Sequence, residues 1–224
     1  MALILNLETA TTNCSVSLGL DGQPIGLKED RSHNYSHAEL LHVFIDDLIA
    51  KSDFSKSEID AIAVSKGPGS YTGLRIGVSA AKGLAYAWDI PLISVSTLES
   101  LAHQVEVEEG MIVPMLDARR LEVYSAIFDS NYQLLRAIEA EILSETSYHK
   151  QLEESVVHFI GNGVEKTSSL IKHSNARFIF DAAPSAEQMC ALSDVKHKKN
   201  DIEDVAYFEP FYLKNFVGTI SKKN

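Results

Sequence analysis

The chain is poor in several features that define common classes of protein. It has only two cysteines, Cys14 and Cys190, and their spacing suits no metal site, so we expect two reduced, partly buried thiols and no disulfide. No basic leader precedes the strand-like run at the amino terminus, and no apolar stretch reaches the ~20 residues that a membrane span requires. These absences favour a cytoplasmic globular protein without a membrane segment.

Positive charge is also scarce, with 20 Lys and Arg against 31 Asp and Glu and a net charge of −11. A protein that binds nucleic acid tightly needs a basic surface for the phosphates. The charge balance therefore argues against tight nucleic-acid binding by this chain alone, and it leaves room for a role beside a basic partner. The apolar fraction of 45% is normal for a globular protein and allows a substantial core.

The most informative segment that is present is the glycine-rich run 64–77, VSKGPGSYTGLRIG. It follows a buried apolar run and leads into a helix, and the free N–H groups at such a helix start favour anions. Its spacing fits neither the dinucleotide fingerprint nor a Walker loop, which ends in Gly-Lys-Ser/Thr. Its signature residues, for which an anion contact is one hypothesis, are Gly67, Pro68, Gly69, Ser70, Tyr71, Thr72, Gly73 and Arg75.

Apolar and alternating runs predict two similar α/β halves. In the first half we expect strands at 3–7, 15–20, 24–28, 61–65 and 91–95, and helices at 36–51, from the loop to about 87, and at 97–105. In the second half we expect strands at 111–116, 122–128, 133–142, 156–160 and 178–180, and helices at 147–154, 165–172 and 185–193. The charged segment 196–204 reads as a loop.

Two of these helices have unusual faces. Apolar residues of the helix at 36–51 cover an arc of roughly 240°, where a helix lying on one sheet needs nearer 100°. The excess predicts either a partner helix or cover from two sides by the chain itself. The helix after the loop is rich in Gly and Ala, which indicates either tight packing on the sheet or a seam shared between chains. Arg75, Lys82 and Tyr86 share one stripe, which we expect to be its solvated edge.

Candidate chemical groups are few, and their ordinary interpretations are favoured. His37 and His42, five residues apart, lack the spacing of a zinc protease helix, while His33 and His37 have the right interval but His33 is expected to precede the helix. Polar surface is the preferred interpretation of all three. The segment Asp117–Arg120 either binds a phosphate or carboxylate or forms a salt-bridged turn, and the structural role is preferred. Glu8 and Asp117 form a carboxylate pair only if the two halves face each other.

Several segments together resemble one known family. They are residues 5–11 (LNLETAT), 66–77 (KGPGSYTGLRIG), 93–98 (ISVSTL), 116–119 with 122–124 (LDAR, EVY) and 210–213 (PFYL). In this order they resemble the TsaB family, also called YeaZ, of the glycoprotease-like M22 group. Members of this family are needed to make threonylcarbamoyladenosine next to the anticodon of tRNA, a tRNA modification.

The resemblance implies an actin/Hsp70/sugar-kinase (ASKHA) fold of two related βββαβα lobes, 1–100 and a degenerate 101–224. It implies a non-catalytic subunit that binds and activates its catalytic paralogue TsaD together with TsaE, with no cofactor of its own and with ATP and metal on the partners. TsaD carries His-x-x-x-His after the strand that matches 93–96. Thr97 and Leu101 stand at that interval here, and neither can replace imidazole as a transition-metal ligand. Residues 161–163, Gly-Asn-Gly, are the nearest approach to an adenine-binding segment.

The resemblance also implies where partners bind. The helices after the three-stranded meander and after the glycine-rich loop would contact TsaD, or a second copy in a homodimer when TsaD is absent, and tRNA would be met only through the complex. The implied interface residues are His37, Leu40, Leu41, Phe44, Leu48, Gly73, Gly77, Ala80, Ala81 and Leu84. Two alternatives stay open: an independent enzyme, either a nucleotide-binding protein of this fold or an M22-type metalloprotease, and an interaction module for another client.

Overall fold

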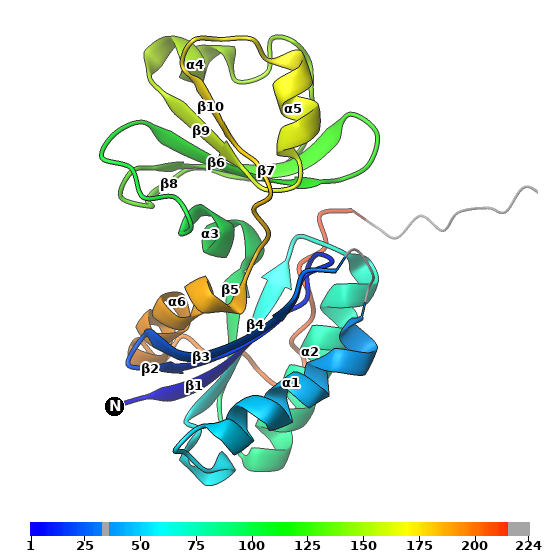
Figure 1. Cartoon of the computed structure of the whole chain (residues 1–224), viewed down its shortest axis with the longest axis vertical. Coiled ribbons are helices and arrows are strands. Elements are labelled where there is room, and N and C mark those ends of the chain that lie inside the picture. Colours follow the sequence, from blue (N-terminus) through cyan, green and yellow to red (C-terminus); the bar gives the residue numbers. More distant parts are fainter. Residues whose placement is uncertain (33–35, 215–224) are drawn as a thin grey trace, which may run out of the picture.

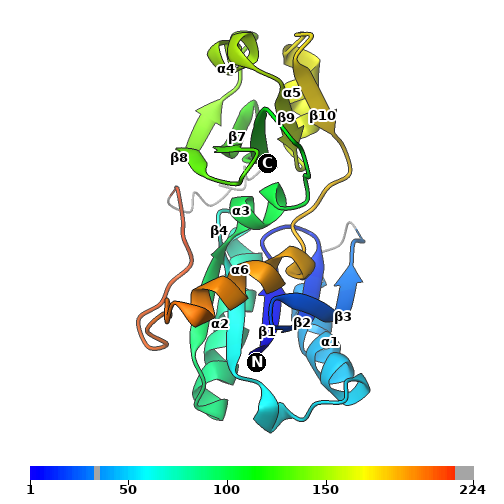
Figure 2. The ribbon, with the colours of Figure 1, turned by 90° about the vertical axis from the view of Figure 1, so that its left-hand side faces the viewer.

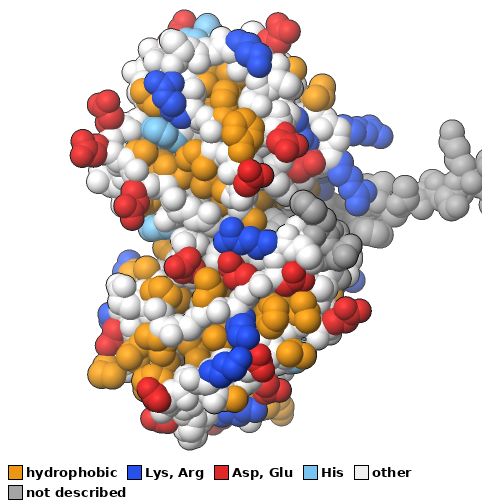
Figure 3. Space-filling view, in the orientation of Figure 1, with side chains coloured by type: hydrophobic (Ala, Val, Ile, Leu, Met, Phe, Trp, Pro, Cys, Tyr) orange, Lys and Arg blue, Asp and Glu red, His pale blue; other side chains and the backbone are white. Residues whose placement is uncertain are grey.

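The chain folds into two α/β lobes stacked one above the other (Figure 1). The computed structural model describes residues 1–32 and 36–214. Each lobe is built on one five-stranded mixed sheet, and the short helix α3, Thr97–Ala102, lies between the lobes (Figure 1). The space-filling view shows a narrow waist at this junction (Figure 3).

The first sheet combines an antiparallel meander with two parallel strands. Its strands are β1 (Leu3–Glu8), β2 (Cys14–Leu20), β3 (Gln23–Asp30), β4 (Ala61–Gly67) and β5 (Leu92–Ser96). They lie in the order β3-β2-β1-β4-β5, with β4 parallel to both β1 and β5. The meander matches the strands expected at 3–7, 15–20 and 24–28.

The second sheet has the same connectivity, with its five successive strands in the places of β1 to β5. Its strands are β6 (Met111–Asp117), β7 (Glu122–Asp129), β8 (Leu134–Ile142), β9 (Val157–Ile160) and β10 (Ala176–Ile179). They lie in the order β10-β9-β6-β7-β8, which is the order of the first sheet with each strand replaced by its counterpart. The predicted fold class, two related α/β lobes, is therefore confirmed.

Helices cover both faces of the first sheet. The helices α1, His37–Lys51, and α2, Tyr71–Trp88, pack on one face, and α6, Ala186–Lys198, packs on the other (Figures 1 and 2). Side chains alternate along a strand, so Leu3, Leu5 and Leu7 of β1 meet α1 and α2, while Ile4 meets α6. In the first lobe, a short 3-10 turn, η1 (Lys56–Glu58), precedes β4. The second lobe has two helices of its own, α4 (His149–Glu154) and α5 (Val164–Leu170).

The small residues of α2 allow the helix to approach the sheet closely. Gly73, Gly77, Ala81 and Ala85 are buried on its inner side. A Cβ atom on Gly73 would lie 2.1 Å from the carbonyl oxygen of Thr9, and one on Gly77 would lie 2.2 Å from Oγ1 of the same residue. Tight packing on the chain's own sheet therefore accounts for this row of small residues.

The expected second lobe spans residues 101–224. In the structure, however, the chain returns to the first lobe after β10, so the carboxyl-terminal helix α6 belongs to the first lobe. Helix α6 contacts β1, β2 and β5, and Glu203 pairs with Leu92 at the edge of β5. The following residues run along the first lobe toward the second (Figure 2). Helix α6 also continues to Lys198, through the start of the segment predicted to be a loop.

Both cysteines are free and buried, as expected. Burial raises the pKa of Cys14 to about 12 and that of Cys190 to about 11, so both are unreactive thiols at neutral pH. Among the helices in the described part of the chain, none is long and apolar enough to cross a membrane.

Candidate functional site

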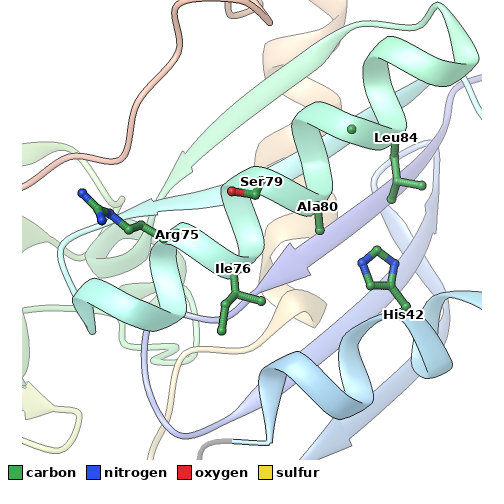
Figure 4. A pocket seen from close by; sticks show the side chains of 7 residues that line it. His42, Arg75, Ile76, Ser79, Ala80 and Leu84 are labelled. Carbon is green, nitrogen blue, oxygen red and sulfur yellow. The ribbon is translucent and has the colours of Figure 1, made fainter.

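The first candidate site is an open groove between α1 and α2 on the outer face of the first lobe (Figure 4). Its volume is about 580 Å³, and it is lined by His42, Arg75, Ile76, Ser79, Ala80, Gly83 and Leu84. Ile76, Ala80 and Leu84 point from α2 toward α1, and His42 points back from α1 (Figure 4). An apolar groove between two helices is a surface on which a helix of another chain can pack.

The residues predicted at a partner interface divide into two sets. Ala80 and Leu84 line the α1–α2 groove, whereas Leu40 and Phe44 are partly exposed on α1 outside its lining, on the stripe of Asp47, which pairs with Lys28 of β3. The others are buried within the chain and fix α1 and α2 to the sheet: His37, Leu41, Leu48, Gly73, Gly77 and Ala81. The prediction omitted His42, Ile76, Ser79 and Gly83. The spacing of Ile76, Ala80 and Gly83, four and three residues apart, places them on one helix face and is the signal that identifies them.

His37 differs from the expected polar surface position because it is only 1% exposed. Its Nε2 atom donates a hydrogen bond to the carbonyl of Thr11, 2.7 Å away, and burial lowers its pKa. The neutral ring thus ties the start of α1 to the turn after β1. His33 lies outside the described residues, and His42 is exposed in the α1–α2 groove.

The glycine-rich loop at the start of α2 is held tightly by the turn after β1. The N–H of Ser70 donates to the carbonyl of Ala10 at 2.6 Å, and the Ser70 hydroxyl caps α2 by accepting from the N–H of Gly73. A Cβ atom on Gly69 would lie 2.4 Å from the carbonyl oxygen of Ala10. These two N–H groups are satisfied inside the chain, so an anion contact at this loop stays a prediction.

Glu8, at the end of β1, organises the same region from the interior. Its Oε1 atom accepts from the N–H of Ala10 at 2.6 Å and from the hydroxyl of Ser65 at 2.9 Å. The side chain is fully buried, and its Oε2 atom has no hydrogen-bond partner among the described residues. Desolvation raises the pKa of Glu8 from 4.5 to about 7.

This raised pKa predicts a pH-dependent stability. The unfolded chain releases the Glu8 proton near pH 4.5 and the folded chain near pH 7, so the free energy of unfolding falls as pH rises through this window. Glu8→Gln retains the accepting oxygen and removes the charge, and above pH 7 it is expected to stabilise the protein on the order of 3 kcal/mol. Urea denaturation of both proteins at several pH values across this window measures the effect. If the free energy of unfolding of the two proteins changed with pH in the same way, the raised pKa of Glu8 would be contradicted.

The second candidate site is the cleft between the lobes, of about 590 Å³. Its walls are the turn after β1 (Ala10, Thr11, Thr12), the loop 68–72, the second-lobe residues Leu116, Asp117, Ala118, Arg119, Tyr124 and Asn162, and the segment 211–214. The N–H of Phe211 donates to the carbonyl of Lys66, and Lys214 pairs with Glu122 of the second lobe. The carboxyl-terminal segment thus crosses from one lobe to the other along this cleft.

Glu8 and Asp117 end equivalent strands of the two lobes, yet they do not form a carboxylate pair. Glu8 is buried in its own lobe, whereas Asp117 lines the cleft and pairs with Lys166 at 2.5 Å. The turn around Asp117 is salt-bridged, as preferred from the sequence, and the partner is this lysine of α5.

The 161–163 segment has a packing role, since Asn162 accepts from the N–H of Asp117 and Gly161 lies against Met115.

The two positions that the TsaD resemblance matches to metal-binding histidines lie in the packed interior between the lobes. Thr97 and Leu101 are fully buried, and Leu101 packs among apolar side chains of the second lobe such as Ile112 and Leu116. Within residues 1–32 and 36–214, no group of three or more His, Cys, Asp or Glu side chains is placed to hold a metal ion.

Comparisons with known proteins place this geometry among its relatives. A family model described as TsaD, tRNA N6-adenosine threonylcarbamoyltransferase, matches residues 31–219. The tRNA threonylcarbamoyladenosine biosynthesis protein TsaB of Haemophilus influenzae is 30% identical over 96% of this chain and 94% of its own length. TsaB of Escherichia coli is 30% identical over 96% of each chain. A solved structure described as YeaZ from Pseudomonas aeruginosa is 25% identical in sequence, and the match covers 95% of this chain and 100% of that chain with a TM-score of 0.82.

Proposed function

Because this chain belongs to the TsaB family within the TsaD group, and so has a role in tRNA threonylcarbamoyladenosine biosynthesis, we propose that it acts as a non-catalytic subunit. In this role it binds the transferase TsaD through the α1–α2 groove and activates it, together with TsaE. The transferase complex then carries out threonylcarbamoyl transfer to the tRNA adenosine next to the anticodon.

The α1–α2 groove is the observation that carries this proposal. The groove exposes Ile76, Ala80 and Leu84 at helical spacing, while the inner sides of the same helices are packed on the sheet. On α1, Leu41 and Ile45 face inward, and His42 lines the groove opposite Ile76, Ala80 and Leu84. Contiguous apolar surface on a folded lobe is typical of a protein interface.

The positions that match the metal-binding histidines of TsaD support a non-catalytic role. Thr97 and Leu101 are part of the packing between the lobes, and their side chains lack the imidazole that a transition metal requires. ATP and metal are therefore assigned to the partner subunits. When TsaD is absent, a second copy of this chain occupies the same groove, and the proposed location of the assembly is the cytoplasm.

Reconstitution of the reaction tests the proposed function. Purified TsaD and TsaE, supplied with tRNA and the activated threonylcarbamoyl donor, are expected to form the modified adenosine only when this chain is added. Nucleoside analysis by mass spectrometry measures the product. Product formed equally well without the chain would contradict the proposal, and ATP turnover by the isolated chain would favour the independent enzyme instead.

A further inference from the structure

The turn between β6 and β7, residues 119–121 (here the Arg turn), has a backbone that its residues do not favour. Arg119 has a φ of +71° and Arg120 a φ of +51°. Residues with a Cβ atom avoid this left-handed region, which Gly, Asn and Asp adopt more readily. Two consecutive arginines in this conformation are an outlier of the kind that clusters at functional sites.

The positive charge of the Arg turn is not neutralised by its neighbours. Asp117 pairs with Lys166 and accepts from the backbone N–H of Arg119, and Glu122 pairs with Lys214. Both nearby carboxylates are thus occupied by lysines, and in the described part of the chain no ion pair involves the guanidinium of Arg119 or Arg120. Both side chains are exposed, so two arginine charges project from a chain whose net charge is −11.

Lys166 fixes the shape of this turn. Its ammonium group donates to the carbonyl oxygens of Arg120 and Glu122 at 2.9 Å as well as to Asp117. The side chain of Lys166 is only 16% exposed, so this cation lies beneath the turn and holds its backbone. The arginines are therefore presented on a fixed turn at the end of the β6–β7 hairpin.

Groups that bind phosphate line the cleft beside the Arg turn. Arg119 is part of the cleft wall, and the first lobe contributes Thr11, Thr12 and Ser70 across from it. Asn162 adds an amide on the side of Arg119. Arginine, hydroxyl and amide side chains are the usual ligands of the phosphates in a nucleic-acid backbone.

We propose that the Arg turn binds the phosphate backbone of the tRNA substrate when the chain is assembled in its complex. The inference rests on the proposed function, and it adds a direct RNA contact to a subunit whose overall charge repels RNA. Two exposed guanidinium groups without an acidic partner among the described residues, held on a fixed turn at the mouth of a cleft that also presents hydroxyl and amide groups, suit the oxygen atoms of a phosphodiester. The contact is local and covers one or two phosphates.

The double variant Arg119→Asn/Arg120→Asn tests this contact. Asparagine is tolerated at a positive φ, so the turn keeps its shape while both charges are removed. The matched control is Lys150→Asn/Lys172→Asn, which removes the same charge from exposed positions at α4 and after α5, away from the cleft. Each complex is assembled with TsaD, and its affinity for unmodified tRNA is measured by fluorescence anisotropy over a range of salt concentrations.

We expect the arginine variant to weaken tRNA binding by about 10-fold and to reduce the slope of log K against log salt by about 1 to 2, with the control unchanged. Its affinity for TsaD, from calorimetry, is expected to equal that of the natural chain. Unchanged tRNA affinity and salt slope would overturn the inference. Weaker binding to TsaD with unchanged tRNA affinity would overturn it too and would assign the Arg turn to an acidic protein surface.

A crosslinking experiment locates the RNA directly. Leu121→p-azidophenylalanine places a photoreactive group on the exposed tip of the Arg turn and leaves both arginines in place. Irradiation of the complex is expected to join this chain to tRNA, whereas a crosslink to protein alone would contradict the inference. If the natural chain forms no complex with TsaD, the proposed function itself fails, and that result is distinct from a complex that forms without the RNA contact.

Discussion

Gly83→Glu is expected to abolish binding of the transferase while leaving the fold intact. Gly83 is exposed in the α1–α2 groove, and a Cβ atom there would meet no atom within 4 Å, so the substitution causes no clash in the free chain. In the complex the carboxylate would be buried against an apolar surface without a partner. We expect the Kd measured by calorimetry to rise by about 100-fold or more, as for a central interface residue.

Two controls make this result specific to the groove. Gly83→Ala adds only a methyl group and is expected to retain binding, and Leu135→Glu adds the same charge at a side chain of β8 that is 55% exposed. Phe44→Asp is a less selective probe because Phe44 also packs against the core of the first lobe. Binding by Gly83→Glu with the affinity of the natural chain would place the transferase on another surface.

Gly73→Ala is expected to destabilise the protein by about 3 kcal/mol or more, although it adds a single methyl group to the same helix. The new Cβ atom would lie 2.1 Å from the carbonyl oxygen of Thr9, and the ring of His37 is 3.4 Å away. Helix α2 must therefore move off the turn after β1, which breaks the hydrogen bond from Thr9 Oγ1 to the carbonyl of Gly73.

Gly83→Ala is the matched control for stability as well as for binding. At this exposed position alanine is expected to stabilise the helix by about 1 kcal/mol relative to glycine. The same chemical change ten residues apart on α2 thus has opposite signs, and urea denaturation measures both. Equal effects of the two substitutions would mean that α2 does not approach the turn as closely as the structure has it.

The strand pattern could be predicted from the sequence because its signal is local. Runs such as Leu3–Leu7 are apolar on both faces, and the alternation in Ser15–Leu20 with the turn at Asp21–Gly22 marks a hairpin. Each prediction needs only neighbouring residues. The repeat of this pattern in the second half was sufficient to predict two related lobes.

The path of the carboxyl-terminal region could not be predicted, since long-range contacts determine it. The polar stripe expected at a solvated edge of α2 illustrates this point. Lys82 donates to the carbonyls of Ala206 and Phe208, and Arg75 donates to the hydroxyl of Tyr212. Arg75 and Tyr86 on that stripe are exposed, as expected, whereas Lys82 is half-buried beneath the carboxyl-terminal segment. Nothing in the spacing of residues 75–86 indicates that a segment more than a hundred residues later forms hydrogen bonds with Arg75 and Lys82.

The candidate sites were partly predictable for a similar reason. A helical face can be identified from its spacing, but the sequence does not say which face the sheet covers. Buried residues such as Gly77 were therefore grouped with partly exposed ones such as Ala80. The roles of His37 and Lys166 depend on hydrogen bonds to carbonyls distant in sequence, that of Thr11 for His37 and those of Arg120 and Glu122 for Lys166. Likewise, the sequence places Asp117 two residues before Arg119 and does not indicate that Asp117 pairs with Lys166 instead of the arginine.

Hydrogen exchange of this chain, alone and bound to TsaD, tests the central claim most directly. The claim is that α1 and α2 together form the surface by which the chain meets its catalytic partner. We predict that binding slows amide exchange in residues 40–48 and 76–84 and leaves the outer strands β8 and β10 unchanged. Slower exchange confined to the cleft or to the second lobe, with α1 and α2 unaffected, would contradict it.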